Sequence, residues 1–375
     1  MFLGGRADAE KELAHALSRQ IGYTSGAYDL ARIFSVLDVF SDNPSAYKEE
    51  VIAHLRANDN EESSEAYLAE ITNFAQSMRL IETVSSRDAR LQRLAPTEYG
   101  RSLLGARHLG NDKFFTYFAT KVVLLADADY LTPILLYDGP QDSADLHSSF
   151  ISFQEDLRER RMRWLAEAIP EKVLLDRIVR QITWLKLGKG IGAAHKIEIP
   201  SRNTARHHAT PRQGWLYYLG MRDENKKVTD FGRAVIKALV PCSPYFWLGP
   251  LEGVEETLQL APAVRKGGPF EDTFNLSGGN PIASEEEIES ILDDIAEIMI
   301  RGFPYAKLVH ASQASLKLPI EYIHYRSYRD KRLYPWETVI QRLFSVKRGL
   351  IERFSAHRGQ VGFYRLKAEF NDGNK

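Results

Sequence analysis

The sequence predicts a mostly α-helical protein of several domains that carries small β-hairpins. Apolar residues recur at helical spacing over much of the 375 residues. Two pairs of short apolar segments, within 80–94 and 350–366, flank polar turns and are typical of hairpins. A short phrase of Thr, acid, aromatic, Gly and Arg occurs twice, at 97–101 and at 229–233. The repetition suggests that one structural unit is used more than once.

Composition limits the classes of protein to consider. Hydrophobic residues make up 44% and charged residues 26% of the chain, which is typical of a soluble globular protein. No apolar run approaches the roughly 18–20 residues that a membrane span needs, and the N-terminus has no signal-peptide core. The single cysteine, Cys242, excludes an internal disulfide framework and a Cys-based zinc site. We therefore expect a cytoplasmic protein with no membrane partner.

The first domain is expected over residues 1–110. Helices are predicted over 7–20 and 27–40, a further helix begins near Pro44, and Ser64 caps a third that runs to Met78. Residues 80–94 form the predicted hairpin, and Thr97 begins the next helix. Both copies of the repeated phrase follow a helix that we expect to end in Met-Arg, at 78–79 and at 221–222.

The middle of the chain is predicted to hold a helical linker and a second domain. Residues 111–137 are strongly apolar and indicate a buried helical hairpin, and 146–168 form a long charged helix. Together 111–170 are expected to be a linker bundle or a dimer interface. The second domain, 171–240, is expected to begin with a helix at Glu171. Its later helices fall within 204–218, with Pro211 opening the last, and a short turn follows at 223–227.

The C-terminal part divides into a linker and a last domain. Residues 241–283 are rich in Pro and Gly and are predicted to be a loop-rich linker. The domain 284–375 begins with the capping box Ser284-x-x-Glu287. Pro319 and Pro335 then begin helices, and a hairpin occupies 350–366.

The order of helices and hairpin over residues 25–105 resembles the winged helix-turn-helix family. Many bacterial members pass from the second wing strand into the next helix through Leu-Thr-x-x-Gly. Leu94-Ala95-Pro96-Thr97-Glu98-Tyr99-Gly100 occupies that place with two inserted residues, and Val228-Thr229-Asp230-Phe231-Gly232 matches more closely. The resemblance implies two to three winged-helix domains joined by helical linkers. The phrase is missing after the last hairpin, so the third domain is the most divergent.

Charge is distributed unevenly along the chain. Residues 1–150 carry 14 Lys+Arg against 22 Asp+Glu, a net −8. Residues 156–213 carry 13 against 6, and 310–369 carry 12 against 5, a net +7 in each block. Such asymmetry indicates one side of the protein that faces a polyanion and another that faces a different partner.

In a winged helix the third helix enters the major groove and the wing meets the backbone. The first such helix, 64–78, holds Glu65 and Glu70 and no basic residue before Arg79, so we expect this domain to bind a protein partner. The second and third domains offer basic and amide side chains that suit double-stranded DNA. The predicted DNA-binding residues are Arg202, Asn203, Arg206, His208, Arg212, Gln213, Lys226, Lys227, Arg329, Arg332, Arg342, Lys347, Arg348 and Arg358.

Several plainer readings remain open. The basic residues could form an ordinary solvated surface, and the tyrosines among them could be core packing. The glycine-rich segment 188–192 lacks the ending of a phosphate-binding loop, and His195, His207 and His208 lack companions at metal-ligand spacing. The acidic cluster 285–294 is explained by its place at a helix N-terminus. We therefore predict no catalytic residues, no metal and no cofactor.

The sequence thus favours a non-catalytic DNA-binding adaptor with tandem winged helices, within a multi-protein complex of the restriction or phage-defence type. One alternative is a nuclease with an unrecognised active site in 241–310. Another is a protein-binding scaffold or transcriptional regulator. A homodimer is compatible with each of these.

Overall fold

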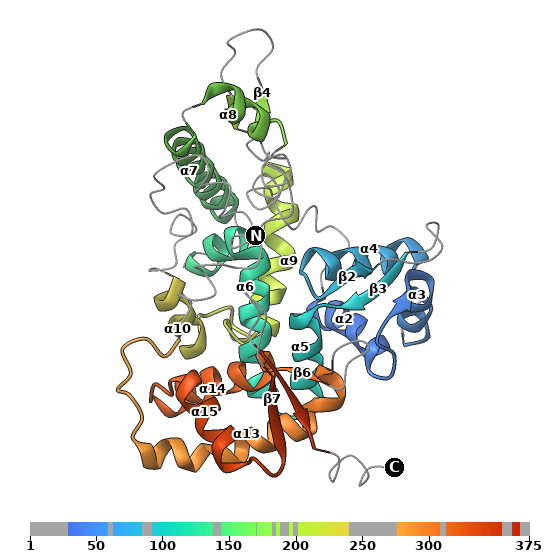
Figure 1. The fold of residues 1–375 in the computed structure, drawn as a ribbon. Coiled ribbons are helices and arrows are strands. Elements are labelled where there is room, and N and C mark those ends of the chain that lie inside the picture. The colour runs from blue at the N-terminus through green and yellow to red at the C-terminus, as the bar shows by residue number, and fades with distance from the viewer. Residues whose placement is uncertain are drawn as a thin grey trace. The chain divides into compact units, whose positions relative to one another are not determined.

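The computed structural model describes eleven stretches of the chain, and within them the fold is mostly helical with small antiparallel sheets, as predicted (Figure 1). The predicted helix 7–20, almost all of the linker 241–283 and the glycine-rich segment 188–192 lie outside the described residues. The structure describes residues 29–58, 63–84, 92–137, 144–169, 171–181, 185–187, 195–197, 202–239, 276–307, 313–354 and 362–367.

The chain divides into two compact units, and residues 30–122 share one of them with residues 277–375. Unit 1 comprises Met1–Asp29 and Val123–Leu276, and unit 2 comprises Leu30–Val122 and Ser277–Lys375. Nothing in the linear sequence indicated that the N-terminal and C-terminal domains would fold together.

The N-terminal half of unit 2, which we call the N-terminal module (residues 30–108), contains a helical segment, a short strand, two helices, a hairpin and a closing helix. Strand β3 lies between β1 and β2 in an antiparallel sheet, with Ala46 opposite Leu94 and Ile81 opposite Pro96. The elements are α2 (Leu30–Ser35), η1 (Val36–Phe40), β1 (Ala46–Tyr47), α3 (Lys48–Ala57), α4 (Glu65–Ser77), β2 (Ile81–Val84), β3 (Arg93–Pro96) and α5 (Glu98–His108).

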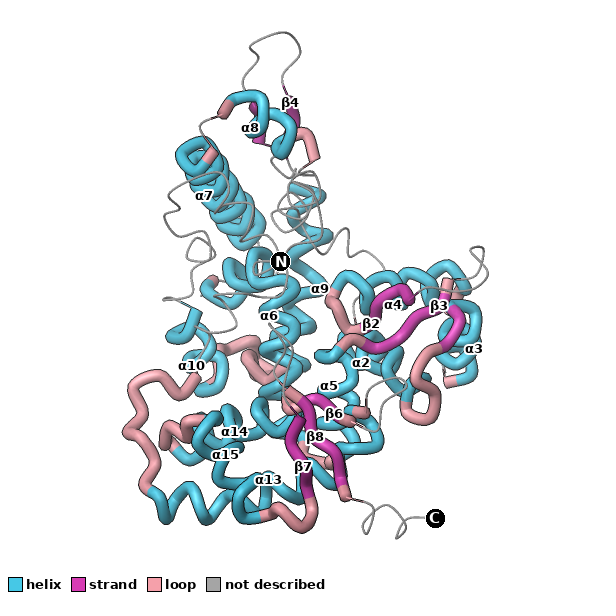
Figure 2. The backbone as a smooth tube through the Cα atoms, in the orientation of Figure 1, coloured by secondary structure: helices cyan, strands magenta, loops and turns pink. Residues whose placement is uncertain are grey.

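The other half of unit 2, the C-terminal module (residues 285–366), repeats this order of elements as far as the hairpin. Its middle strand β8 lies between β6 and β7 (Figure 2), so the strand order matches that of the N-terminal module. The predicted hairpin and both predicted helices are confirmed. The elements are α13 (Glu285–Ala306), β6 (Ala314–Ser315), α14 (Lys317–Asp330), α15 (Trp336–Val346), β7 (Ile351–Phe354) and β8 (Phe363–Leu366).

The helix starts read from the sequence are confirmed at atomic level. The Ser64 hydroxyl accepts from the backbone N–H of Tyr67 at the start of α4. Ser284 and Glu287 form the complete capping box of α13, each side chain accepting from the other residue's backbone N–H. These bonds satisfy N–H groups that have no partner within the first turn.

The repeated phrase forms the same backbone junction in both places. In unit 2, the Thr97 hydroxyl donates to the carbonyl oxygen of Arg79 and accepts from the N–H of Gly100, at 2.5 and 3.1 Å. In unit 1, the Thr229 hydroxyl does the same with Gly220 and Gly232, at 2.6 and 3.0 Å. Each threonine therefore caps its own helix and also ties it to the end of an earlier helix.

The glycine of each phrase is required because the helix passes directly over a peptide group. A Cβ atom on Gly100 would lie 1.9 Å from the carbonyl oxygen of Leu80. A Cβ atom on Gly232 would lie 2.2 Å from that of Met221. Both separations are far below any van der Waals contact.

These bonds correct the alignment of the two copies. The residue in the left-handed conformation at the end of the earlier helix is Arg79 in one copy and Gly220 in the other, with φ of 58° and 65°. Leu80 and Met221 follow them, and each donates its N–H five residues back, at 3.0 and 2.9 Å. The Met-Arg pairs expected to match are therefore two residues out of register, because Met78 precedes the left-handed residue and Met221 follows it.

The two modules of unit 2 are joined where α5 crosses α13 at a pair of glycines. The Cβ position of Gly105 lies 3.6 Å from the carbonyl oxygen of Gly302. Leu318 from α14 packs on both glycines, with its Cδ2 atom 2.9 Å from the Cβ position of Gly105 and 2.3 Å from that of Gly302. A side chain larger than hydrogen at either glycine would therefore displace Leu318 from the crossing.

Polar contacts extend this crossing at both ends. Arg101 of α5, largely buried, donates from Nη1 to the carbonyl oxygen of Lys307 at 3.0 Å. Arg301 of α13 donates to the carbonyl oxygen of Leu109 at 3.1 Å, and the rings of His108 and Tyr305 stack with centroids 3.9 Å apart. The modules are thus held in one fixed orientation.

Unit 1 is built mainly from long helices, and two predictions about them are wrong. Residues 112–136 form a single helix kinked at Asp127 rather than a hairpin. Pro211 lies inside α9 and does not begin a separate helix. The elements of this part are α6 (Asp112–Leu136), whose first turns belong to unit 2, α7 (Ala144–Ala168), α8 (Lys172–Val179), β4 (Leu185–Leu187), β5 (His195–Ile197), α9 (Arg202–Tyr218) and α10 (Asp230–Leu239).

The glycine contacts give a direct test. We expect Gly100→Ala and Gly232→Ala each to lower the free energy of unfolding by about 3 kcal/mol, because the methyl group would displace a helix from a backbone carbonyl. Chemical denaturation followed by circular dichroism measures the change. Gly349→Ala is the control, since nothing lies within 4 Å of its Cβ position, and a change within about 0.5 kcal/mol is expected there. Equal, small effects at all three positions would contradict the proposed contacts.

Candidate nucleic-acid interface

The exposed face of α15 carries side chains that can read the edges of bases. Val339, Ile340 and Leu343 turn into the core of the C-terminal module. The opposite face exposes polar side chains that can hydrogen-bond to base edges, among them Gln341 and Arg342, and it also carries the acid Glu337. The exposed polar residues of α15 are Glu337, Thr338, Gln341, Arg342 and Ser345, and exposed Arg348 lies two residues beyond the end of the helix.

The hairpin that follows α15 adds further basic residues. Arg353, Arg365 and Lys367 are exposed on β7, on β8 and just beyond β8. Arg365 pairs with Glu352 across the hairpin at 2.7 Å, and the Arg353 guanidinium lies 5.9 Å from the ring of Phe344. Within the described part of the chain, Arg348 and Lys367 make no ion pair. The predicted residue Arg358 lies at the hairpin tip, outside the described residues.

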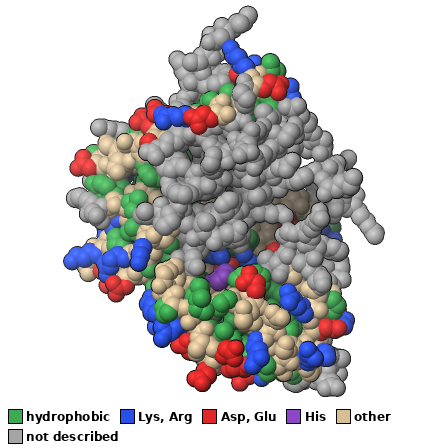
Figure 3. Space-filling model, turned by 60° about the vertical axis from the view of Figure 1, so that its left-hand side comes forward, with side chains coloured by type: hydrophobic (Ala, Val, Ile, Leu, Met, Phe, Trp, Pro, Cys, Tyr) green, Lys and Arg blue, Asp and Glu red, His purple; other side chains and the backbone are tan. Residues whose placement is uncertain are grey.

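The acidic cluster at the start of α13, explained from the sequence by the helix dipole, pairs with the basic residues around α15. Arg342 Nε lies 2.5 Å from Glu289 Oε1, and Lys347 Nζ lies 2.5 Å from Asp293 Oδ1. On the face drawn in Figure 3, basic and acidic side chains are correspondingly mixed. Two of the predicted DNA-binding residues thus already have acidic partners.

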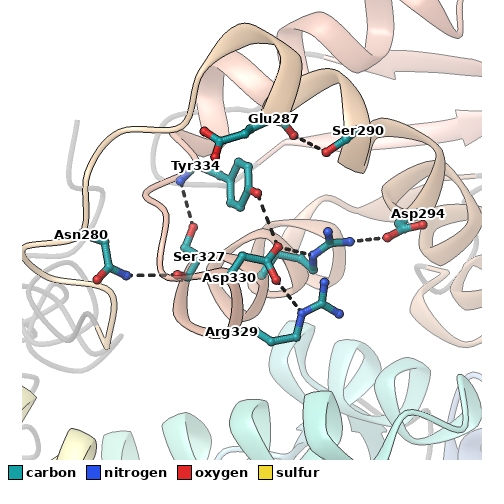
Figure 4. A network of polar contacts seen from close by, with 9 residues as sticks. Asn280, Glu287, Ser290, Asp294, Ser327, Arg329, Asp330 and Tyr334 are labelled. Atoms are coloured by element: carbon teal, nitrogen blue, oxygen red, sulfur yellow. Dashed lines mark hydrogen bonds and ion pairs between the residues drawn. The ribbon is translucent and has the colours of Figure 1, made fainter.

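Two more of the predicted residues, Arg329 and Arg332, are also paired with acids, Arg329 in a network around Asp330. Its carboxylate accepts from Arg329 Nε at 2.7 Å, from Arg326 Nε at 2.8 Å and from the Tyr334 hydroxyl at 3.4 Å (Figure 4). Arg332 pairs with Glu287 at 2.7 Å, and this hydrogen bond lowers the pKa of the Glu287 carboxyl. Arg332 therefore ties the segment between α14 and α15 to α13, whereas Arg329 pairs within α14, and both retain exposed surface.

The corresponding face of the N-terminal module has the opposite character. Helix α4 exposes Glu65 and Asn73 and half-exposes Glu70, and it contains no Lys or Arg. Arg56 of α3 pairs with Glu65 at 3.2 Å, and Lys48 donates to Asn73 at 2.7 Å. The difference in charge between the two modules, which the sequence predicted, is thus present on their surfaces.

In unit 1, the structure corrects two of the predicted DNA-binding residues. Arg212 is completely buried and binds Asp127 through two hydrogen bonds, from Nε at 2.5 Å and from Nη2 at 2.8 Å. His208 is 1% exposed, and its ring lies 5.1 Å from that of Tyr130. Neither side chain reaches the surface. Arg212 is held inside because it neutralises the carboxylate of Asp127 at the kink of α6. The sequence did not reveal this pair because its members are 85 residues apart.

Other predicted residues in unit 1 do reach solvent. Arg206 lies exposed on α9, and Lys226 and Lys227 lie exposed on the turn after it, whereas Gln213 is half-buried. The side chains of Arg202 and Asn203 lie outside the described residues. Of the DNA-binding cations predicted in unit 1, three are therefore exposed to solvent, fewer than the sequence predicted.

Elsewhere in unit 2, α6 and α14 enclose a group of charged side chains that the sequence analysis missed. Glu321 is fully buried, and its Oε1 atom lies 2.8 Å from Lys121 Nζ and 3.2 Å from Lys317 Nζ. His324 Nδ1 lies 3.5 Å from the other carboxylate oxygen. The two lysine side chains are only 4% and 6% exposed. Lys121 and Glu321 are 200 residues apart, so no local pattern links them.

Burial and mutual attraction set the charges of this group. Desolvation lowers the pKa of Lys317 to about 8, although Glu321 opposes the shift. Desolvation by itself would raise the pKa of Glu321, but Lys121 and Lys317 outweigh it and hold that pKa well below its usual range. Glu321 is therefore the carboxylate that allows two ammonium groups to be buried between helices.

Comparison with known proteins identifies no relative. No family model matches the chain, and neither a curated protein nor a solved structure matches it significantly. Across the described ranges, no helix combines the length and apolar character needed to cross a bilayer. In the same residues, no three His, Cys, Asp or Glu side chains are grouped as metal ligands would be. A function must therefore be inferred from the charged and polar surfaces of the protein itself.

The buried charge group predicts an asymmetric mutational response. We expect Glu321→Gln to lower the free energy of unfolding by about 3–5 kcal/mol, because two buried ammonium groups would lose their carboxylate. Lys317→Met is the matched control and should cost much less, since Glu321 keeps Lys121 as a partner. Urea denaturation measures both, and equal losses would contradict the central role of Glu321.

The same group predicts a dependence on pH. The native pKa of Lys317, about 8, lies below the ordinary value of 10.5, so between these values the unfolded chain binds more protons. The stability contributed by this group therefore rises with pH over that window, by at most about 1.4 kcal/mol per unit. We expect the wild type to gain stability relative to Lys317→Met between pH 8 and pH 10.5, as measured by denaturation. A constant difference would show that Lys317 titrates normally.

Proposed function

We propose that this protein is a non-catalytic DNA-binding adaptor, and that its C-terminal module is the part that contacts duplex DNA. The observation that carries the proposal is the exposed face of α15, where Gln341 and Ser345 precede exposed Arg348, just beyond the helix, and the basic hairpin β7–β8. Amide, hydroxyl and guanidinium groups on one helix face suit the major groove.

The arrangement of both modules in unit 2 supports their interpretation as winged helices. In each, a helical segment precedes a short strand, two helices and a hairpin, and the last strand lies in the middle of the sheet. In such a unit α15 corresponds to the recognition helix, and β7–β8 corresponds to the wing. We propose that α15 enters the major groove while Arg353 and Lys367 contact phosphates.

The acidic N-terminal module supports the adaptor part of the proposal. Its equivalent helix, α4, offers Glu65 and Glu70, which repel a phosphate backbone. We propose that this module binds a protein partner, within a cytoplasmic DNA-acting complex of the defence type. The exposed cations of unit 1, Arg206, Lys226 and Lys227, provide a second place for DNA to make contact.

Duplex binding should fall steeply with salt and should depend on a few side chains. We expect the triple variant Arg348→Ala, Arg353→Ala, Lys367→Ala to reduce the slope of log affinity against log salt by about 2 to 3, because it removes two phosphate contacts and a third cation beside the groove. Fluorescence anisotropy with a labelled duplex at several salt concentrations measures this. Arg56→Ala, an exposed arginine of the N-terminal module, is the control and should leave the slope unchanged. Wild-type affinity retained by the triple variant would exclude α15 and its hairpin as the interface.

The proposal also distinguishes base contacts from phosphate contacts. Once a preferred site has been selected from random duplexes, Gln341→Ala should lose about 1–3 kcal/mol on that site. It should lose little on an unrelated duplex. Equal losses on both would show that Gln341 does not read sequence.

A further inference from the structure

The cations beside the proposed recognition face are paired with acids from a neighbouring helix of the same module. Glu289 and Asp293 are one turn apart on α13, so both can face the edge of α15. Their partners are Arg342, which points from the exposed face of α15, and Lys347, which follows its last turn. The acids therefore lie next to the surface that DNA would approach.

These pairs are weak enough to be exchanged. The Arg342 side chain is 56% exposed and that of Asp293 is 85% exposed, so water screens both pairs. Exposed pairs of this kind contribute little to stability. The hydrophobic contacts of Ile291, Leu292 and Ile295 with the rest of the core hold α13 independently of them. A phosphate could thus replace a carboxylate without unfolding the module.

We infer that the acidic face of α13 competes with DNA phosphates for Arg342 and Lys347, and so restrains binding by the C-terminal module. This inference rests on the proposed function. In the unbound protein, Glu289 and Asp293 occupy the two cations. A duplex gains these phosphate contacts only by displacing the carboxylates, which also repel it at close range.

The consequence is a bias toward specific sites. Arg348 makes no ion pair within the described residues, and Gln341 is uncharged, so neither is opposed by an acid from α13. Contacts to phosphates through Arg342 and Lys347 carry a cost that contacts to bases through Gln341 do not. The acids therefore lower the affinity for arbitrary duplexes more than they lower the affinity for a preferred site.

The test is to neutralise the two acids while keeping their size. For the double variant Glu289→Gln, Asp293→Asn, we expect threefold to tenfold tighter binding to an arbitrary duplex in the full-length protein, measured by anisotropy. The salt slope should steepen by up to about 2, because two more cations become available to phosphates. Glu297→Gln is the matched control, since that glutamate is an exposed residue of the same helix and pairs with Arg301 on α13 itself.

A second arm separates competition from a simple change of net charge. A quadruple variant adds Arg342→Gln and Lys347→Gln to the double variant. It should bind duplex no tighter than a protein that carries only Arg342→Gln and Lys347→Gln. Persistence of the gain without these cations would overturn the inference. Thermal melting of each variant shows whether the module remains folded.

The outcomes distinguish the inference from the proposed function. If the wild type binds duplex and the double variant binds no tighter, only the inference fails. If the folded double variant binds more weakly, the pairs position α15 for binding, and the inference is again overturned. If no version binds duplex even at low salt, the proposed function and the inference fail together.

Discussion

The crossing of α5 and α13 at Gly105 and Gly302 is the constraint on which the rest of unit 2 depends. Two modules far apart in the sequence become one body because these helices approach closely enough for Leu318 to pack on both glycines. Arg101 and Arg301 then satisfy backbone carbonyls at either end of the crossing. The orientation of the acidic α4 face relative to the basic α15 face follows from this contact, as does the geometry of any adaptor built on them.

Charge acts differently in the core and at the surface of this protein. In the core, Glu321 and Asp127 bind their basic partners out of contact with water, so the loss of one member would leave an uncompensated buried charge. At the surface, the acids of α13 bind cations that remain hydrated, and the pairs contribute little to stability. Only the second kind is available for exchange with a ligand.

Helix starts, hairpins and the contrast in charge between α4 and α15 could be predicted because each depends on neighbouring residues. A capping box acts over four residues, as Ser284 and Glu287 show. The candidate site was predicted less completely. Gln341, exposed on α15, was not among the predicted residues, and Arg212 and His208 were wrongly included. Sequence composition alone does not distinguish an arginine that faces solvent from one that neutralises a buried aspartate.

By itself, the sequence determined several helix starts, the two hairpins and the two Thr-to-Gly junctions, since these arise from short-range hydrogen bonds and from the absence of a side chain at Gly100 and Gly232. The tertiary structure decided which domains share a core and which charges remain exposed. It joined residues 30–122 to residues 277–375 through packing between α5 and α13, and it placed the acids of α13 beside Arg342 and Lys347. These contacts link residues tens to hundreds of positions apart, and they exist only once helices have packed, so no local pattern encodes them.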